Sequence, residues 1–347
     1  MHTLPLLFLG SFPLAALAGN GFADSHFGGH TRHHDSNSRR APSNATGTNT
    51  TYQLIDKYQG DSFLDGWDFF DGADPSHGSV KYLDEKSAKA KGLAITTLLN
   101  STQLSVDSTS ILSVGGVRNS VRIGSKKTYN GGLFIADFYG MPSGCGVWWS
   151  AGPGWPEGGE IDIIEGVNNQ TNNQMTLHTG SEGGACTLNG NLSSTISGLR
   201  AFTSNVMGTQ CESTEDANAG CAFSDPDPLS FGSGFTKGQG GVFAHLWDST
   251  GIKMWRFARN AIPADITSGQ PNPASWPTPQ AAWSSASCDM ASNFYNHTLT
   301  LDTTICGDWA GGAYSNSGCP GTCEEAVADP TNFASAKWDI HYIAVYQ

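Results

Sequence analysis

The sequence is poor in charged residues. Only 14% of its 347 residues are Asp, Glu, Lys or Arg, against roughly 25% in an average soluble protein. Acidic residues outnumber basic ones by 31 to 18, which gives a formal net charge of −13. Such a chain cannot neutralise a phosphate backbone and is not drawn to an anionic membrane surface, so we expect no nucleic-acid and no membrane partner. A neutral polymer such as a polysaccharide is compatible with this balance.

Long hydrophobic runs are also missing. The apolar stretch from Leu4 to Leu17 is shorter than the about 20 residues that a transmembrane helix needs. It has the length of a signal peptide, and Ala16-Leu17-Ala18 gives a small-x-small cleavage pattern, so we predict a signal peptide at 1–18 and a secreted, extracellular protein. The C-terminus lacks the apolar tail of a lipid-anchor signal. Sequons for N-glycosylation fit this route and lie at Asn44, Asn49, Asn100, Asn169, Asn191 and Asn296.

Several catalytic and metal-binding motifs are absent. The eight cysteines form no C-x-x-C pair and no zinc-ligand spacing follows them, so we predict no metal centre and no cofactor. No G-x-S-x-G motif is present, which speaks against a serine hydrolase. An even number of cysteines in a secreted chain favours disulfides. Their pairing cannot be deduced from spacing, although Cys319–Cys323 and Cys211–Cys221 are plausible short loops.

The N-terminal part after the signal peptide has the composition of a disordered segment. Gly, Ser, Asn, Thr and His dominate residues 19–51. Its histidines could chelate a metal, but a solvated leader accounts for them more simply. Arg39-Arg40 before Ala41 resembles a dibasic processing site, which makes 19–40 a candidate propeptide. N-terminal sequencing of the mature protein would test this. The histidines in question are His26, His30, His33 and His34.

From Tyr52 onward, short segments alternate polar and apolar residues between Gly, Asn, Asp and Ser turns, which is typical of β-strands. One short helix is expected at Cys323–Ala328, before Pro330. No repeat or linker divides this part of the chain. We therefore predict one all-β domain at 52–347, a β-jelly-roll sandwich of two curved antiparallel sheets with a substrate cleft on the concave face. The predicted strands are 119–123, 132–138, 160–164, 174–178, 297–301 and 338–346, with a hairpin formed by 242–247 and 252–257.

The most informative segment is GGEIDIIEG at 158–166. Its acids alternate with β-branched residues, as in a strand. Glu160 and Asp162 are two residues apart and share a face, whereas Glu165 lies an odd step further and would point to the other face. A β-bulge between Asp162 and Glu165 would return Glu165 to the face of the other two acids.

Three clustered carboxylates raise one another's pKa, which suits acid/base chemistry better than a structural role. Glycoside hydrolysis uses one carboxylate and one carboxylic acid on either side of the sugar. Two Glu residues on one bent strand favour the close pair of a retaining enzyme, about 5–5.5 Å apart. The alternatives are a solvated polar strand face and a calcium site, since Ca²⁺ also prefers clustered carboxylates.

GGEIDIIEG resembles the active-site strand of glycoside hydrolase family 16, and in particular its fungal laminarinase-like members. The resemblance implies that Glu160 is the nucleophile, Asp162 its assistant and Glu165 the acid/base. The spacing E-x-D-x-x-E is similar to the β-1,3-glucanase branch rather than to xyloglucan transglycosylases and lichenases. The resemblance spans 52–347 and is carried further by DPSHG (74–78), RNSVRI (118–123), KTY (127–129), MPSGCG (141–146), TLHTG (176–180), CGDWAG (306–311), GCPGTC (318–323) and the terminal WDI...VYQ.

The resemblance also implies substrate-binding residues. His178 matches a family histidine beside the catalytic pair, and Trp155 and Trp309 match tryptophans that stack on sugar rings. Arg118 and Asn119 could bind sugar hydroxyls. Their structural alternatives are a hydrogen-bonded strand histidine, core tryptophans and a sheet-edge ion pair. The loop between Gly146 and Glu160 is shorter than in the family, and Trp148 or Trp149 could replace a cleft tryptophan there.

We therefore predict a retaining endo-β-1,3(4)-glucanase that acts as a monomer on β-glucan, its only expected partner. Two alternatives remain. A β-glucan transglycosylase would use the same nucleophile but pass the glycosyl unit to a sugar. A non-catalytic glucan-binding jelly roll would keep the aromatic cleft, but it would not need all three acids.

Overall fold

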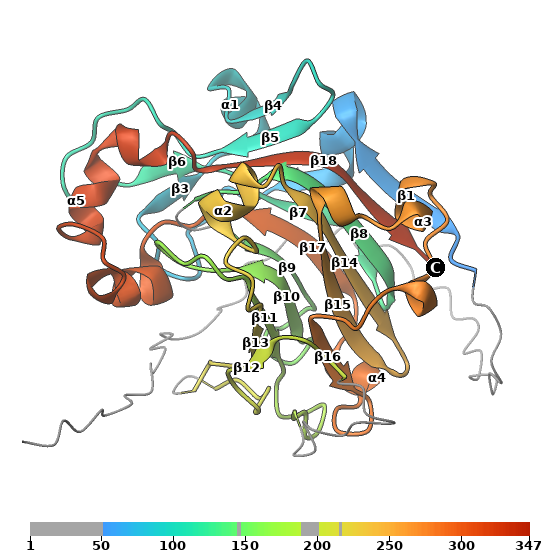
Figure 1. The fold of residues 1–347 in the computed structure, drawn as a ribbon. Coiled ribbons are helices and arrows are strands. Elements are labelled where there is room, and N and C mark those ends of the chain that lie inside the picture. Colours follow the sequence, from blue (N-terminus) through green and yellow to red (C-terminus); the bar gives the residue numbers. More distant parts are fainter. Residues whose placement is uncertain (1–50, 144–146, 189–200, 215–216) are drawn as a thin grey trace, which may run out of the picture.

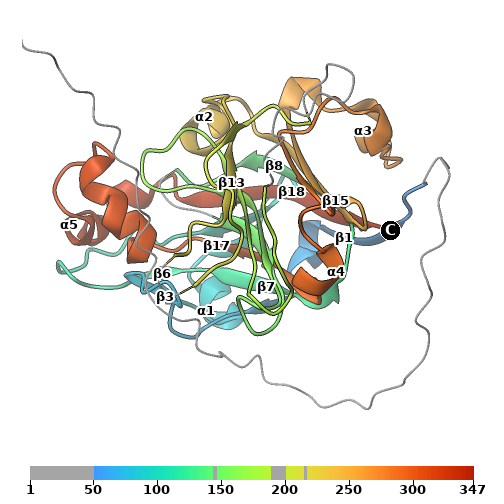
Figure 2. The same cartoon turned by 90° about the horizontal axis from the view of Figure 1, so that it is seen from below.

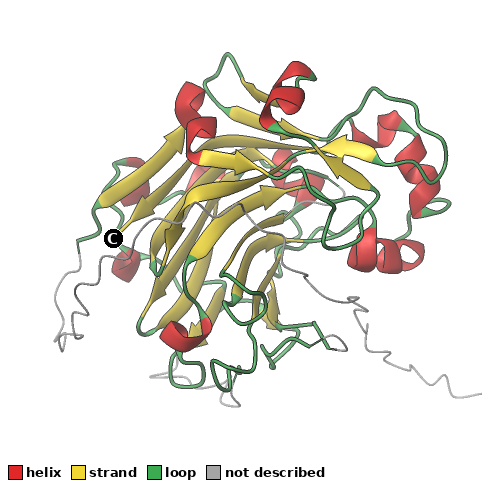
Figure 3. Cartoon of the chain, turned by 180° about the vertical axis from the view of Figure 1, so that it is seen from behind, coloured by secondary structure: helices red, strands yellow, loops and turns green. Residues whose placement is uncertain are grey.

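The fold is that of a computed structural model, which describes residues 51–143, 147–188, 201–214 and 217–347, with the backbone alone at 147–150. The predicted signal peptide (1–18) and nearly all of the predicted leader (19–51) therefore lie outside the described residues, and so do Cys145 and the sequons at Asn44, Asn49 and Asn191. Strands are the main regular secondary structure of the described chain, long loops connect them, and the helices are short and peripheral (Figure 3).

Two large sheets form the molecule (Figures 1 and 2). Sheet A has the order β16-β15-β14-β8-β18-β5-β4, and β1 also pairs with β18. All of its pairs are antiparallel. Its strands are β1 (Leu54–Gln59), β4 (Ala94–Thr96), β5 (Thr102–Ser105), β8 (Gly132–Gly140), β14 (Gly241–Asp248), β15 (Gly251–Ala258), β16 (Ala281–Ser284) and β18 (Lys337–Tyr346).

Sheet B has the order β12-β13-β11-β10-β9-β17-β7-β2 and is also antiparallel. Its strands are β2 (Trp67–Phe69), β7 (Arg122–Tyr129), β9 (Val147–Ala151), β10 (Glu160–Glu165), β11 (Gln174–His178), β12 (Asn205–Val206), β13 (Cys221–Ser224) and β17 (His297–Asp302). A separate parallel pair joins β3 (Val80–Tyr82) and β6 (Arg118–Ser120).

The main core lies between the two sheets. Ile161, Ile163 and Leu177 of sheet B belong to the same buried cluster as Phe134 and Ile343 of sheet A. Alternate residues of these strands thus point inward, in agreement with the alternation of apolar and polar residues in the sequence. A second buried cluster covers the other face of sheet A, where Trp255 and Trp276 pack edge to face. The antiparallel jelly-roll sandwich predicted from the sequence is confirmed.

The short helices connect strands and cover the edges of the sandwich. The α-helices among the described residues are α1 (Glu85–Ala90), α2 (Gly232–Lys237), α3 (Ala264–Thr267), α4 (Met290–Asn293) and α5 (Cys323–Ala328). Tighter 3-10 turns are η1 (Gly60–Gly66), η2 (Arg259–Ala261), η3 (Pro273–Ser275), η5 (Tyr314–Asn316) and η6 (Pro330–Phe333), and η4 (Gly307–Gly311) is a π-helical turn. No described helix has both the length and the apolarity to cross a membrane.

Most predicted elements are confirmed. The helix α5 and the strand β11 have the predicted bounds, and β14 and β15 form the predicted hairpin. The single strand predicted at 119–123 was wrong, because β6 ends at Ser120 and β7 begins at Arg122, and the two belong to different sheets.

Three disulfides join described cysteines: Cys186–Cys288, Cys211–Cys221 and Cys306–Cys323. The predicted Cys211–Cys221 pair is confirmed. The predicted Cys319–Cys323 pair was wrong, because Cys323 is bonded to Cys306 across a separation of 17 residues, and Cys319 has no disulfide partner among the described cysteines.

Candidate active site

The three acids of β10 lie on one face of sheet B. Across the sheet, Glu160 pairs with His178, Asp162 with Thr176, and Glu165 with Gln174. Successive partners on β11 are always two residues apart. On β10, Asp162 follows Glu160 by two residues but Glu165 follows Asp162 by three, and the register of the pairing shifts between them. The extra residue is the predicted β-bulge, and it brings Glu165 to the same side as Glu160 and Asp162.

The side chain of Asn173 spans this bulge. Its Oδ1 accepts a hydrogen bond from the backbone N–H of Glu165 at 3.1 Å, and its Nδ2 donates to the carbonyl of Ile163 at 2.9 Å. Asn173 is 1% exposed, so both bonds are made away from water. A bulge leaves backbone groups out of the sheet ladder, and the amide side chain satisfies two of them. Asn173 therefore fixes the direction in which Glu165 leaves the strand.

Glu160 lies at the start of β10 and is partly exposed. The indole Nε1–H of Trp155 donates to its Oε2 at 2.6 Å. Burial raises the pKa of Glu160 to about 7, while this hydrogen bond and the charge of Arg122 oppose the increase. Both opposing interactions stabilise the ionised form, which is the form that a nucleophile needs.

Glu165 lies at the end of β10 beside two polar residues of β11. Its Oε2 accepts hydrogen bonds from Gln174 Nε2 and Thr176 Oγ1, each at 3.3 Å. Burial raises the pKa of Glu165 to about 8, and the nearby charge of Glu160 adds to the increase. A carboxyl group that keeps its proton near neutral pH can act as a general acid.

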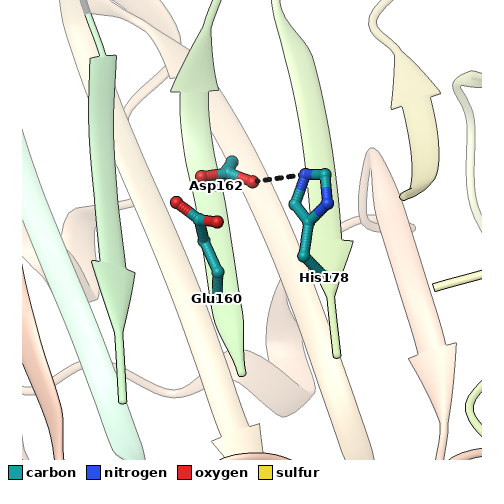
Figure 4. A group of neighbouring side chains, drawn as sticks. All are labelled: Glu160, Asp162 and His178. Carbon is teal, nitrogen blue, oxygen red and sulfur yellow. Dashed lines mark ion pairs between the residues drawn. The ribbon is translucent and has the colours of Figure 1, made fainter. Parts of the chain in front are cut away.

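Asp162 lies between the two glutamates and is 2% exposed. Burial raises its pKa well above the usual value, and the charges of Glu160 and Glu165 add to this. Its Oδ2 lies 3.4 Å from Nε2 of His178 (Figure 4). The other ring nitrogen of His178, Nδ1, contacts Ser213 Oγ at 2.9 Å. Burial lowers the pKa of His178 to about 4, so its imidazole is neutral at neutral pH. The structure thus brings His178 to the three acids of β10.

Two charged residues that the sequence analysis missed lie close by. Arg122 of β7 faces Asp302 of β17, with Nη1 and Oδ2 3.5 Å apart. Both charges reach Glu160, where Arg122 lowers the pKa and Asp302 raises it. Arg122 was visible in the RNSVRI motif, but a single Asp at the end of a strand carries no sequence signal.

The structure places Arg118 and Asn119 elsewhere, on β6 of the small parallel sheet. Arg118 is 0% exposed, and its guanidinium donates to the carbonyls of Asp107, Ser110 and Val327. Asn119 Nδ2 faces Asp107 Oδ2 at 3.4 Å. Arg118 has no surface to offer a sugar, so we remove it from the substrate-binding set. Asn119 is partly exposed on the small parallel sheet, and its part in substrate binding stays a prediction.

The structure places the three predicted substrate-binding tryptophans in different surroundings. Trp155 contacts Glu160 directly, as described above. Trp309 is partly exposed in η4, whose Ala310 carbonyl accepts a hydrogen bond from Asn168 Nδ2 at 2.9 Å. Asn168 follows Glu165 by three residues, so Trp309 lies near that end of β10. The backbone of Trp148 pairs with Ile164, but its side chain lies outside the described atoms.

Comparisons with known proteins agree with this geometry. The family model "XgeA-like, catalytic GH16 domain" matches residues 67–346. A probable glycosidase of Schizosaccharomyces pombe is 42% identical over 304 residues, which are 86% of this chain and 70% of that protein. A probable endo-1,3(4)-β-glucanase of Aspergillus fumigatus also matches, and this chain spans 46% of its length. The chain therefore spans about half the length of such curated relatives.

Two solved structures are similar over their whole length. Laminarinase 16A from Phanerochaete chrysosporium, determined with 6-O-glucosyl-laminaritriose in its donor and acceptor sites, has 40% identity and a TM-score of 0.79, covering 86% of this chain and 100% of its own. An elongating family 16 β-1,3-glucosyltransferase has 38% identity and a TM-score of 0.77, covering 85% and 100%. On the match of the family model and of these relatives, the chain belongs to glycoside hydrolase family 16, among its fungal laminarinase-like members.

Proposed function

We propose that this protein is a secreted, retaining endo-β-1,3(4)-glucanase that hydrolyses β-1,3-linked and mixed-linkage glucan. The observation that carries the proposal is the bulged strand β10, which presents Glu160 and Glu165 on one face in different environments. The indole of Trp155 and the charge of Arg122 favour the carboxylate form of Glu160, whose pKa is about 7. Glu165 has a pKa of about 8 and therefore keeps its proton to higher pH. Two carboxyl groups with different proton affinities are what glycoside hydrolysis requires.

The mechanism assigns one role to each glutamate. Glu160 attacks the anomeric carbon and forms a glycosyl–enzyme ester, while Glu165 gives its proton to the departing glycosidic oxygen. Glu165 then takes a proton from water, and the resulting hydroxide releases the sugar and regenerates Glu160. Asp162, held beside Glu160, buffers the charge as the ester forms and breaks. Trp155 and Trp309 are the candidate platforms for the glucose rings, and His178 positions Asp162.

Product analysis on β-1,3-glucan tests this proposal. We expect proton NMR to show oligosaccharides that first appear as the β-anomer, and Glu160→Gln to reduce turnover at least about a thousandfold without loss of folding. Products that first appear as the α-anomer would contradict retention. Unaltered turnover of Glu160→Gln would contradict the nucleophile assignment, and glucan binding without any product from the unmodified protein would favour a recognition module.

A transglycosylase is the second candidate, because an elongating β-1,3-glucosyltransferase is 38% identical to this chain. The two activities differ only in the acceptor that attacks the glycosyl–enzyme. Incubation with a labelled laminari-oligosaccharide at rising concentration separates them. A hydrolase yields shorter products throughout, whereas a transglycosylase yields labelled products longer than the acceptor.

Secretion and a monomeric state belong to the same proposal. Three disulfides join described cysteines, and such bonds persist mainly in oxidising compartments. Mass spectrometry of culture supernatant and of cell extract would locate the protein, and sedimentation equilibrium would give its mass in solution. We expect the mature chain outside the cell with the mass of one copy.

A further inference from the structure

Glu160, Asp162 and His178 form a compact group of nitrogen and oxygen donors (Figure 4). One donor atom from each lies within 4.8 Å of the other two. They come from adjacent strands, because Glu160 pairs directly with His178 between β10 and β11. Among the residues that the structure describes, no other group of three such side chains comes this close.

Two of the donors already have the spacing of metal ligands. Oδ2 of Asp162 and Nε2 of His178 are 3.4 Å apart. Two ligands bound at about 2.0–2.2 Å to a tetrahedral ion lie roughly 3.3–3.6 Å apart. Glu160 supplies the third donor atom within the same 4.8 Å, and its Oε2 accepts the hydrogen bond from Trp155.

The oxygen of Asp162 that faces this group lacks a hydrogen bond. Asp162 is 2% exposed, and its Oδ2 has no hydrogen-bond partner among the described residues. A buried polar atom without a partner is costly, and a bound cation would remove that cost. This oxygen lies 3.4 Å from Nε2 of His178 without a hydrogen bond between them, and it points to a ligand that would satisfy both atoms.

The neighbouring residues resemble the surroundings of a bound metal. A metal-binding histidine usually uses its other ring nitrogen for a hydrogen bond that fixes the ring. His178 does this, because its Nδ1 contacts Ser213 Oγ at 2.9 Å. Trp155 fixes Glu160 in the same way through the indole bond at 2.6 Å.

We propose that Glu160, Asp162 and His178 bind a divalent transition-metal ion, of which Zn²⁺ is the model, and that this ion inhibits the enzyme. One imidazole and two carboxylates suit zinc, with the fourth position left to water. Calcium, which takes six to eight oxygen ligands, does not fit three donors that include a nitrogen. The proposed site departs from the prediction of no metal centre, but not from the prediction of no cofactor, since the ion is an inhibitor.

Binding would block catalysis for two reasons. The ion occupies the carboxylate of Glu160, which is the nucleophile of the proposed function. It also places positive charge where the sugar becomes positively charged in the transition state. The binding itself rests on geometry alone, while inhibition also rests on the proposed function, so the two are measured separately.

The experiment is isothermal titration calorimetry of the full chain with ZnCl₂. The test variants are His178→Gln, Glu160→Gln and Ser213→Ala. The matched control is His341→Gln, because His341 also faces a carboxylate, Asp137, at 3.0 Å but belongs to no group of three ligands. Leader histidines at positions 26–34 are present in every variant and contribute equally. Circular dichroism confirms that each variant is folded.

Beyond the contribution of the leader histidines, which is common to all variants, we expect one zinc-binding event whose affinity falls at least about tenfold in each test variant and is unchanged in His341→Gln. We expect zinc to inhibit glucan hydrolysis by the unmodified enzyme at matching concentrations, and EDTA to reverse it. Wild-type zinc binding by folded His178→Gln and Glu160→Gln would overturn the site. Zinc that binds there without slowing hydrolysis would overturn the inhibition, although the proposed glucanase activity would stand.

Discussion

At the residue scale, Glu165 has the environment of a proton donor. Burial raises its pKa to about 8, and hydrogen bonds from Thr176 and Gln174 limit the increase because they favour the carboxylate. A general acid acts only while protonated, so activity should fall as pH rises through the pKa of Glu165. Removing one of these hydrogen bonds should raise that pKa further.

Thr176→Val tests this with a nearly isosteric change. We expect the alkaline limb of kcat/KM to move to higher pH by about one unit, since a hydrogen bond to a charged group is worth at least about 1.5 kcal/mol and one pKa unit corresponds to about 1.4 kcal/mol. The control is Thr102→Val, because Thr102 is equally buried and its hydroxyl has no partner among the described residues. A shift to lower pH in Thr176→Val would contradict the role of Glu165.

Arg118 is a structural residue in this fold. Its buried guanidinium satisfies the carbonyls of Asp107, Ser110 and, within α5, Val327, and it stacks on Phe333, 4.7 Å from the ring centroid. Arg118→Met should lower the free energy of unfolding by about 3 kcal/mol or more, because these carbonyls lose their donor. Urea unfolding measures the loss, and KM of the folded enzyme should not change. A raised KM at unchanged stability would return Arg118 to the substrate site.

The roles of some of these residues could be predicted from the sequence, and those of others could not. The spacing of Glu160, Asp162 and Glu165 predicts both the bulge and the chemistry, because the period of a strand is fixed. Alternation could not separate Arg118 from Arg122, which are four residues apart and would share a face of one continuous strand. The break at Val121 sends them to different sheets. Asn173 acts through two backbone groups and has no motif.

At the element scale, the bulge of β10 depends on Asn173. Asn173→Ala removes both hydrogen bonds to the bulge and should let Glu165 move. We expect kcat to fall about 10- to 100-fold with little change in KM, because displacing a catalytic group by an ångström can cost a hundredfold. Steady-state kinetics of Asn172→Ala provide the control, since Asn172 donates to Asp225 and not to the bulge. Equal losses in the two variants would count against the assignment.

Elements that have a clear local sequence motif could be predicted, whereas elements without such a motif could not. The helix α5 has a capping box between Thr322 and Glu325, which the chain shows as T-C-E-E. The helices α1 to α4 are four to six residues long, too short to display a helical period. The Cys186–Cys288 disulfide joins residues 102 apart, and nothing local indicates such a pair.

At the scale of the whole molecule, the two ends of the described chain meet in sheet A. β1 pairs with β18, with Leu54 opposite Tyr346 and Gln59 opposite Tyr342, and the C-terminus lies beside β1 in Figure 1. The alternation of both strands is visible in the sequence, but their pairing is not, because almost the whole domain separates them. Sequence pattern thus predicts layers better than strand order.

Truncation from the N-terminus tests this pairing and the predicted start of the domain at 52. Removal of residues 1–51 should leave Tm unchanged. Removal of residues 1–59 should lower it by about 5–10 °C, because β1 and the buried Tyr58, which contacts Tyr129 through its hydroxyl, are lost. Differential scanning calorimetry gives both values. Equal Tm values for the two truncations would show that β1 adds no stability.

The position of β18 also determines when this protein can fold. It lies between β8 and β5 in the middle of sheet A, yet it is the last of the described strands along the chain. Until β18 has been synthesised, β8 and β5 each expose an unpaired edge that invites aggregation. The sandwich therefore closes only after β18 has left the ribosome. A message truncated before codon 337 should yield insoluble chains and not a shortened enzyme.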